Sequence, residues 1–224
     1  MISHHHETLF VHIPKCGGMS IEFMFLTDLG LDWDTRAPLL LRQNPTRSLG
    51  PQSLAHLLPA EYLRYRYLSE KLFAAYYRFA FVRDPYARAV SLYNYLFRRP
   101  EVPVDTHLTL AAFVQDWLPG EFRVGRESYV SPHDYPGQFW FVRPQVDFIF
   151  DDAGQSLVDD VFRLEERDAA LPRIRARSGV RAPQQHANRA SGDIATVADL
   201  TSSHRAIIGD LYRRDFEALG YAMA

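Results

Sequence analysis

The chain has 224 residues, of which 47% are hydrophobic and 23% are charged. This length and composition fit one α/β domain with a substantial apolar core, and they exclude a mainly disordered chain. The net charge of −2 provides no overall positive field for nucleic acid or an anionic membrane. We therefore predict a single domain over residues 1–224, without a nucleic-acid partner, in which any anionic ligand is held by local positive charge.

Cysteine content and apolar runs bear on the compartment. The single cysteine, Cys16, leaves no intrachain disulfide and suits a reducing environment. No apolar stretch approaches the ~18 residues of a membrane span. The first residues, 1–7, lack the charged-then-apolar pattern of a secretory signal. We expect a cytoplasmic protein with no membrane span.

Three consecutive histidines, His4 to His6, lie near the start of the sequence. Histidine tracts can bind metals. Three adjacent side chains cannot all face one ion, however. We predict a solvated end of the chain here and no metal site.

The next residues predict a strand, a turn and a helix. Residues 8–13 are apolar and β-branched, which is typical of a buried strand, and Pro14 bounds them. The segment 14–18 contains two glycines and predicts a turn, and residues 19–29 carry apolar side chains at helical spacing. Many nucleotide-binding α/β domains begin with this order of elements.

The rest of the chain continues the alternation of strands and helices. We predict further strands over 78–82, 146–150 and 160–164. We predict helices over 59–77, 84–99, 108–118, 165–177 and 199–219, with Asp84 as an N-cap, Pro85 in the first turn and Gly220 after the last helix. This pattern predicts an α/β fold with a central, mainly parallel sheet flanked by helices.

The first motif is a glycine turn between the first long strand and its helix, with the sequence HIPKCGGMS over residues 12–20. Main-chain N–H groups at a helix start can bind an anion, and glycines allow close approach. Lys15 can reach the bridging oxygen of a phosphate ester, and Ser20 can donate a further hydrogen bond. Lys15 and Lys71 are the only lysines, so a lysine here indicates a need for a compact ammonium group. Lysine precedes the glycines, whereas it follows them in the ATPase loop GxxxxGK[ST].

The second motif is FVRDPYARAVSLY over residues 81–93. Arg83 follows a predicted strand at its carboxyl end, where open α/β sheets bind ligands. Ser91 lies about two turns into the helix that begins at Asp84 and Pro85. An arginine fork and a serine hydroxyl can together hold a terminal phosphate. Alternatively, Arg83 pairs with a carboxylate and Ser91 only packs.

Together the two motifs resemble the sulfotransferase superfamily, and in particular the branch with heparan sulfate 2-O-sulfotransferase and bacterial family-2 sulfotransferases. The resemblance implies a three-layer P-loop-like fold. The expected soluble character of the chain, unlike the membrane-anchored relatives, predicts a bacterial enzyme. The resemblance also implies 3′-phosphoadenosine 5′-phosphosulfate (PAPS) as donor, PAP as product and a hydroxyl acceptor such as a saccharide or glycolipid. Two sets of residues are implied for the nucleotide: Lys15, Cys16, Gly17, Gly18, Met19 and Ser20 for the 5′-phosphosulfate, and Arg83 and Ser91 for the 3′-phosphate.

The loop departs from the family pattern at two positions. Cys16 and Met19 stand where the family usually has hydroxyl residues. Two side-chain donors are lost, worth about 1 kcal/mol each if nothing replaces them. The main-chain donors survive, so the pattern remains compatible with phosphosulfate binding.

Histidine is the expected general base, because its ordinary pKa is near neutrality. His56 lies in SLAH followed by PAEYL, which resembles the family segment with its catalytic histidine. His186, in a polar loop that resembles one near the nucleotide, is the reserve base. His12 is expected to be a satisfied core histidine. Lys15 is expected to stabilise charge on the leaving oxygen.

Other residues leave alternatives open. Glu165 either orients the acceptor or forms a structural ion pair, and Arg189 lies in the polar loop near the nucleotide. An aromatic segment either lines a sugar groove or packs in the core; it contains Tyr135, Phe139, Trp140 and Phe141. A Cys16 thiol nucleophile lacks a partner placed by sequence.

Two other functions compete with a PAPS-dependent sulfotransferase. One is a nucleotide-dependent phosphotransferase, which the lysine–glycine order and the lack of an assignable Walker-type acidic strand oppose. The other is a non-catalytic nucleotide-binding or scaffold protein, which the loop departures at Cys16 and Met19 keep open. Stabilisation by PAP with no effect of ATP would favour the sulfotransferase.

Overall fold

The computed structural model describes residues 1–44, 54–97, 108–128, 139–183 and 195–224. The chain forms two compact units, each built from two segments. The sheet unit comprises Met1–Val82 and Asp147–Asn188, and the helical unit comprises Arg83–Val146 and Arg189–Ala224. The prediction of a single domain over residues 1–224 remains a prediction.

The described residues of the sheet unit form four strands in the order β1-β2-β3-β4. The strands are β1 (Ile2–Ser3), β2 (Thr8–Val11), β3 (Tyr77–Val82) and β4 (Asp160–Arg163). β2, β3 and β4 are parallel, and β1 is antiparallel to β2. All four residues of β2 are buried, as the continuous apolar run predicts. This confirms the predicted α/β class with a central, mainly parallel sheet.

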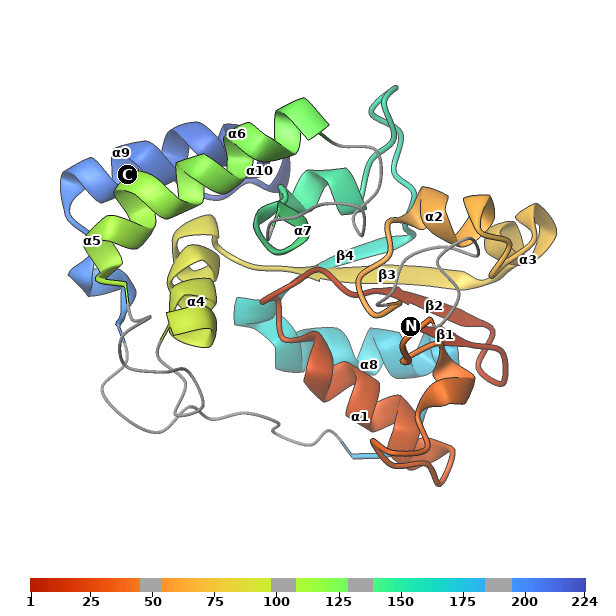
Figure 1. Cartoon of the computed structure of the whole chain (residues 1–224). Helices are drawn as coiled ribbons and strands as arrows, with labels where there is room; N and C mark the ends of the chain where they lie inside the picture. The colour runs from red at the N-terminus through yellow and green to blue at the C-terminus, as the bar shows by residue number, and fades with distance from the viewer. Residues whose placement is uncertain (45–53, 98–107, 129–138, 184–194) are drawn as a thin grey trace. The chain divides into compact units, whose positions relative to one another are not determined.

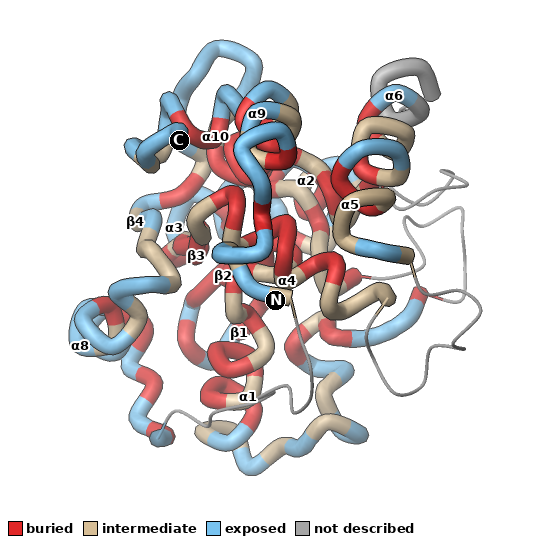
Figure 2. Tube along the Cα trace, turned by 90° about the vertical axis from the view of Figure 1, so that its left-hand side faces the viewer, coloured by how far each residue is buried: buried red, intermediate tan, exposed pale blue. Residues whose placement is uncertain are grey.

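Helices lie on both sides of this sheet (Figure 1). α1 (Gly18–Asp28) and α8 (Arg167–Ser178) lie on one side, and α2 (Pro59–Arg64) lies on the other. α3 (Glu70–Ala75) leads into β3. Short 3₁₀ turns cover Ala37–Leu39 and Leu164–Glu166. Figure 2 shows β1, β2 and β3 as mainly buried, whereas β4 is only partly buried and most of α8 is exposed.

The histidine-containing start of the chain is not a solvated end, which corrects the prediction for it. Ile2 pairs with Leu9 in the β1–β2 ladder, and Met1, Ile2 and Ser3 are all buried. Nδ1 of His6 lies 2.7 Å from the hydroxyl of Ser3, and its Nε2 lies 3.0 Å from a carboxylate oxygen of Asp28. His6 is therefore a buried structural residue, whereas His4 and His5 are exposed.

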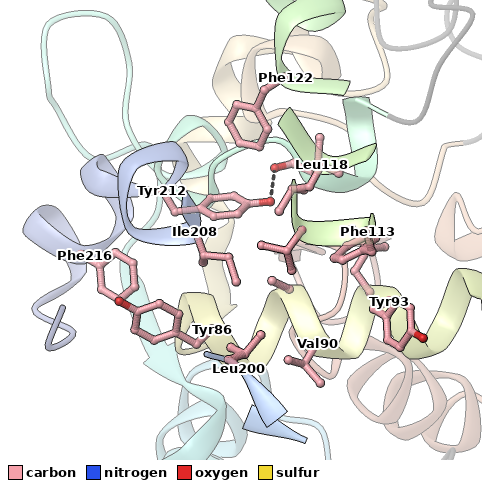
Figure 3. Packing of buried hydrophobic residues seen from close by; sticks show 14 of the residues in the cluster. Tyr86, Val90, Tyr93, Phe113, Leu118, Phe122, Leu200, Ile208, Tyr212 and Phe216 are labelled. Atoms are coloured by element: carbon pink, nitrogen blue, oxygen red, sulfur yellow. Dashed lines mark hydrogen bonds between the residues drawn. The ribbon is translucent and has the colours of Figure 1, made fainter. Parts of the chain in front are cut away.

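The helical unit is assembled around α4 (Pro85–Phe97). Its other helices are α5 (Leu110–Ala112), a π-helical segment (Phe113–Trp117), α6 (Leu118–Ser128), α7 (Phe139–Val142), a 3₁₀ turn (Val197–Asp199), α9 (Ser202–Leu211) and α10 (Arg213–Leu219). Figure 3 shows their shared apolar core, in which the rings of Tyr86 and Phe216 lie 4.9 Å apart. The hydroxyl of Tyr212 donates to the carbonyl of Val142 at 2.7 Å.

Several predicted elements differ from the structure. The predicted helix 108–118 is α5 followed by the π-helical segment, and helical structure continues through α6 to Ser128. The predicted helix 59–77 is two helices, because Arg66 takes a left-handed conformation (φ 59°) and Ser69 caps α3. The predicted helix 199–219 is divided at Tyr212 into α9 and α10. The predicted strand 146–150 is instead a 3₁₀ turn over Gln145–Phe148.

The lost strand has a physical reason. The main-chain N–H groups of Gln145 and Val146 donate to the buried carboxylate of Asp215, at 2.9 and 3.0 Å. Main-chain groups that are already paired with a side chain cannot join a strand ladder. An apolar run by itself does not reveal such a partner.

Candidate functional site

The glycine loop joins β2 to α1 in the sheet unit. Gly17 is the N-cap of α1 and has a left-handed conformation (φ 77°, ψ 13°), and Lys15 is also left-handed (φ 67°). No side chain caps this helix, and its first turn contains no acidic residue. The N–H groups of the first turn, at the positive end of the helix dipole, thus form an environment suited to an anion.

Each glycine has a structural reason. Gly17 is left-handed (φ 77°), which favours glycine, whereas a β-carbon there would meet only the movable end of the Leu164 side chain, 2.5 Å from Cδ1. A β-carbon at Gly18 would collide with the imidazole ring of His12. The sequence suggested that glycine allows the close approach of an anion. The structure adds that the ring of His12 leaves no room for a side chain at Gly18.

The remaining loop residues differ in exposure. Lys15 and Met19 are partly exposed, and Ser20 is buried in the first turn of α1. Cys16 is only 1% exposed, and its thiol donates to the carbonyl of Pro14 at 3.6 Å. A buried thiol directed at the main chain does not suit the alternative of a cysteine nucleophile.

His56 lies beside the end of β2 in the same unit. Its Nδ1 is 2.8 Å from the carbonyl oxygen of His12, and the two rings meet edge to face with centroids 4.3 Å apart. A carbonyl oxygen can only accept, so Nδ1 carries the proton, and Nε2 is the basic nitrogen of the neutral ring.

The surroundings of His56 keep its ring neutral. Removal from water is the main cause, and the neighbouring His12 and the positive charge of Lys15 act in the same direction. Together they hold the pKa of His56 well below its usual value. A neutral imidazole near the glycine loop is chemically able to accept a proton at neutral pH.

His12 forms a buried pair with Glu22, which the sequence analysis did not identify. Nδ1 of His12 lies 2.6 Å from Oε1 of Glu22, and both residues are buried. The prediction of a satisfied core histidine is confirmed. Glu22 lies on the apolar face of α1 next to Ile21 and Phe25, so a carboxylate on that predicted face was the available signal.

The second motif lies in the helical unit. The side-chain oxygen of Gln145 accepts from the main-chain N–H of Arg83 at 2.8 Å, and the Gln145 amide donates to the carbonyl of Arg83 at 2.9 Å. Asp84 accepts from the N–H of Ala87 at 2.8 Å, which confirms the predicted N-cap. The side chain of Gln145 therefore holds both the main-chain N–H and the main-chain carbonyl of Arg83.

Ser91 is partly exposed on α4, and within the described part of the chain its hydroxyl makes no hydrogen bond. Arg88, by contrast, is buried, donates to the carbonyl of Phe141 at 3.0 Å and lies over the ring of Tyr212. Burial raises the pKa of Asp215, and Arg88 opposes this rise. Arg88 is thus a structural residue of the helical unit.

Other predicted residues are less informative. His186, Arg189 and Tyr135 lie outside the described residues. Glu165 is exposed in the 3₁₀ turn Leu164–Glu166, before the start of α8. Phe139 packs in the core against Phe122, with ring centroids 6.0 Å apart.

The described ranges contain no group of three or more His, Cys, Asp or Glu side chains that could hold a metal ion. They also contain no helix that combines the length and apolar character needed to cross a membrane.

Comparison with known proteins gives the family. A model of the sulfotransferase family matches residues 1–116, which include both motifs and His56. The chain therefore belongs to the sulfotransferase family, and its class of activity is sulfuryl transfer. No curated protein and no solved structure matches it.

Proposed function

We propose that the protein transfers a sulfuryl group from PAPS to a hydroxyl of a carbohydrate-like acceptor, with His56 as general base. Family membership supports sulfuryl transfer. The observation that most supports the specific mechanism is the 2.8 Å contact between Nδ1 of His56 and the carbonyl of His12. It leaves Nε2 as the proton acceptor in a ring that the surroundings keep neutral.

The glycine loop fits the 5′-phosphosulfate end of the donor. An uncapped helix start, left-handed residues at 15 and 17, and a lysine beside them suit a multiply charged anion. PAPS supplies an activated sulfuryl group on a phosphate leaving group. The ammonium group of Lys15 stabilises the negative charge that develops on the leaving oxygen. Loop residues 16–20 bind through their main-chain N–H groups, with Ser20 as the side-chain donor.

Arg83 and Ser91 are proposed to bind the 3′-phosphate. Arg83 can form paired charge-assisted hydrogen bonds to phosphate oxygens. The Gln145 contacts that hold its main chain reduce the ordering cost of such a site. The partly exposed hydroxyl of Ser91 can donate an additional bond.

In the proposed reaction, one proton moves and one bond to sulfur replaces another. Nε2 of His56 removes the proton from the acceptor hydroxyl as its oxygen bonds to sulfur, and the bond between sulfur and the phosphate oxygen breaks. The chain's contribution is positioning and charge stabilisation, as in phosphoryl transfer. A cytoplasmic, bacterial setting remains part of the proposal.

The first experiment compares ligands by thermal unfolding. PAP should raise the melting temperature, whereas ATP should not, because the loop lacks the Walker order of lysine and serine. Stabilisation by ATP would instead favour the phosphotransferase.

The second experiment incubates the enzyme with radiolabelled PAPS and fractionated cell glycans. PAP binding without label transfer to any hydroxyl acceptor would favour the scaffold protein.

A further inference from the structure

Burial of the His12–Glu22 pair costs folding free energy, because it removes a carboxylate from water. Glu22 is 0% exposed and His12 is 5% exposed, and one carboxylate oxygen, Oε1, lies 2.6 Å from Nδ1 of His12. Within the described residues, the other oxygen, Oε2, is buried without a hydrogen-bond partner. A buried carboxylate that is only partly satisfied destabilises the fold, so its presence calls for a functional explanation.

His12 connects the glycine loop with the proposed base. Its ring fills the space next to Gly18, where a β-carbon would collide with it. The same ring meets the ring of His56 edge to face, and the carbonyl of His12 accepts from Nδ1 of His56 at 2.8 Å. Glu22 fixes this ring from α1, so three elements of the sheet unit meet at one imidazole.

The contact with the carbonyl of His12 selects a tautomer of His56. A free histidine side chain in water prefers the proton on Nε2. The carbonyl oxygen can only accept, so the fold imposes the Nδ1–H tautomer, which makes Nε2 basic. The other tautomer would carry its proton on the nitrogen that has to accept one.

We propose that Glu22 and His12 are positioning residues that hold His56 in the Nδ1–H tautomer and keep Nε2 directed for proton abstraction. The proposal rests on the proposed role of His56 as the base. Glu22 holds the ring of His12, the ring holds the end of β2, and the carbonyl at that end holds His56. Neither Glu22 nor His12 touches the reacting atoms in this scheme.

The test reads the tautomer directly, without nucleotide or acceptor. Two-bond ¹H–¹⁵N spectra of the protein labelled on histidine ¹⁵N distinguish the two tautomers, and the spectrum of His56→Gln identifies the signal of His56. The wild type should show the Nδ1–H form. A wild-type signal of the Nε2–H form at His56 would overturn the proposal.

Two variants then test Glu22. Glu22→Leu removes the acceptor for His12, so His56 should lose its single tautomer and kcat should fall ~10- to 100-fold, as expected for a displaced catalytic group. Glu22→Gln keeps an oxygen that can accept from Nδ1 of His12, so it should retain the tautomer and most of kcat. Both variants are compared at saturating PAPS, because a displaced His12 ring also lies against Gly18 in the loop.

Asp28 offers a matched control on the same helix. It forms a second carboxylate–histidine pair among the described residues of the sheet unit, with His6 at 3.0 Å, and accepts from the main-chain N–H groups of Arg181 and Ala182. Asp28→Leu should lower the melting temperature while leaving the tautomer of His56 and kcat unchanged. The same kinetic loss in Asp28→Leu would show general destabilisation and defeat the proposal.

The outcomes separate this proposal from the proposed function. An unchanged tautomer or an unchanged kcat in Glu22→Leu would refute the role of Glu22 while leaving sulfuryl transfer intact. Absence of PAP binding and of sulfuryl transfer in the wild type would instead refute the proposed function, with the tautomer measurement still readable.

Discussion

The imidazole ring of His12 occupies the space into which a β-carbon at Gly18 would project. The ring cannot move freely, because Glu22 holds its Nδ1 at 2.6 Å. The shape of the glycine loop is therefore set partly by a side chain in the strand that precedes it. This relationship makes Gly18 the loop position with the clearest steric consequence.

Gly18→Ala should destabilise the protein and weaken PAP binding. The added methyl group must displace the ring of His12 or the loop, and overpacking of this kind costs about 1–3 kcal/mol. Gly120→Ala is the matched control, because Gly120 is also helical but a β-carbon there would meet nothing within 4 Å. That substitution should leave stability unchanged or raise it by up to about 1 kcal/mol. Urea unfolding and PAP titration check both variants, and equal stability of the two would contradict the steric argument.

The left-handed conformation of Lys15 predicts opposite effects on stability and activity. A non-glycine residue in this region costs roughly 1–2 kcal/mol, and glycine relieves that cost. Lys15→Gly should therefore be at least as stable as Lys15→Ala, and both should lose most sulfuryl transfer because the ammonium group is gone. Thermal unfolding and initial rates with PAPS measure the two effects.

Arg66 provides the control for Lys15. It is exposed and also left-handed, with φ 59°. Arg66→Gly should gain stability in the same way and keep full activity. Retention of activity in Lys15→Ala would exclude the proposed role of Lys15 in stabilising the leaving oxygen.

The sequence was sufficient for the frame of the fold and the two motifs. The strands at residues 8–11, 77–82 and 160–163 follow from short β-branched and aromatic runs, and Asp84 and Pro85 mark the start of α4. These features depend on local propensity and capping, which a single sequence contains.

The rest depended on contacts between distant residues. The turn at Gln145 follows from its main-chain bonds to Asp215, 70 residues away. The tautomer of His56 follows from a carbonyl 44 residues earlier in the chain. No local pattern encodes a partner at that separation. The carboxylate of Glu22 on an apolar helix face was a signal in the sequence that the prediction did not use.

Arg83→Ala and Ser91→Ala should discriminate between nucleotides. If these residues bind the 3′-phosphate, each variant should weaken PAP far more than adenosine 5′-monophosphate, which lacks that group. A charged hydrogen bond contributes roughly 1.5–3 kcal/mol, so Arg83→Ala should weaken PAP about tenfold or more. Isothermal titration with both ligands provides the measurement. Equal losses for the two nucleotides would rule out the assignment.

His56→Ala should cut turnover by ~10²–10⁴ while leaving PAP affinity nearly intact, because a general base acts on the acceptor. Initial rates at saturating PAPS and a PAP titration provide the two measurements. A large loss of PAP binding would indicate a structural role instead, and His186 would then be the next residue to test.

The pH dependence gives a second, independent signature of His56. Its surroundings lower its pKa in the folded protein, so the base stays neutral, and the rate stays level, to a lower pH than an ordinary histidine would allow. In the wild type, kcat/KM should therefore fall only below about pH 6.5, the usual pKa of histidine.

The lowered pKa of His56 also affects the stability of the fold, because the unfolded chain binds this proton at a higher pH than the folded protein does. Stability should thus decline as pH falls from about 6.5 toward the folded-state pKa. In His56→Ala the acid limb of the rate profile should disappear, together with this part of the pH dependence of unfolding. An acid limb that persists unchanged in the variant would assign the titration to another group and remove His56 from the mechanism.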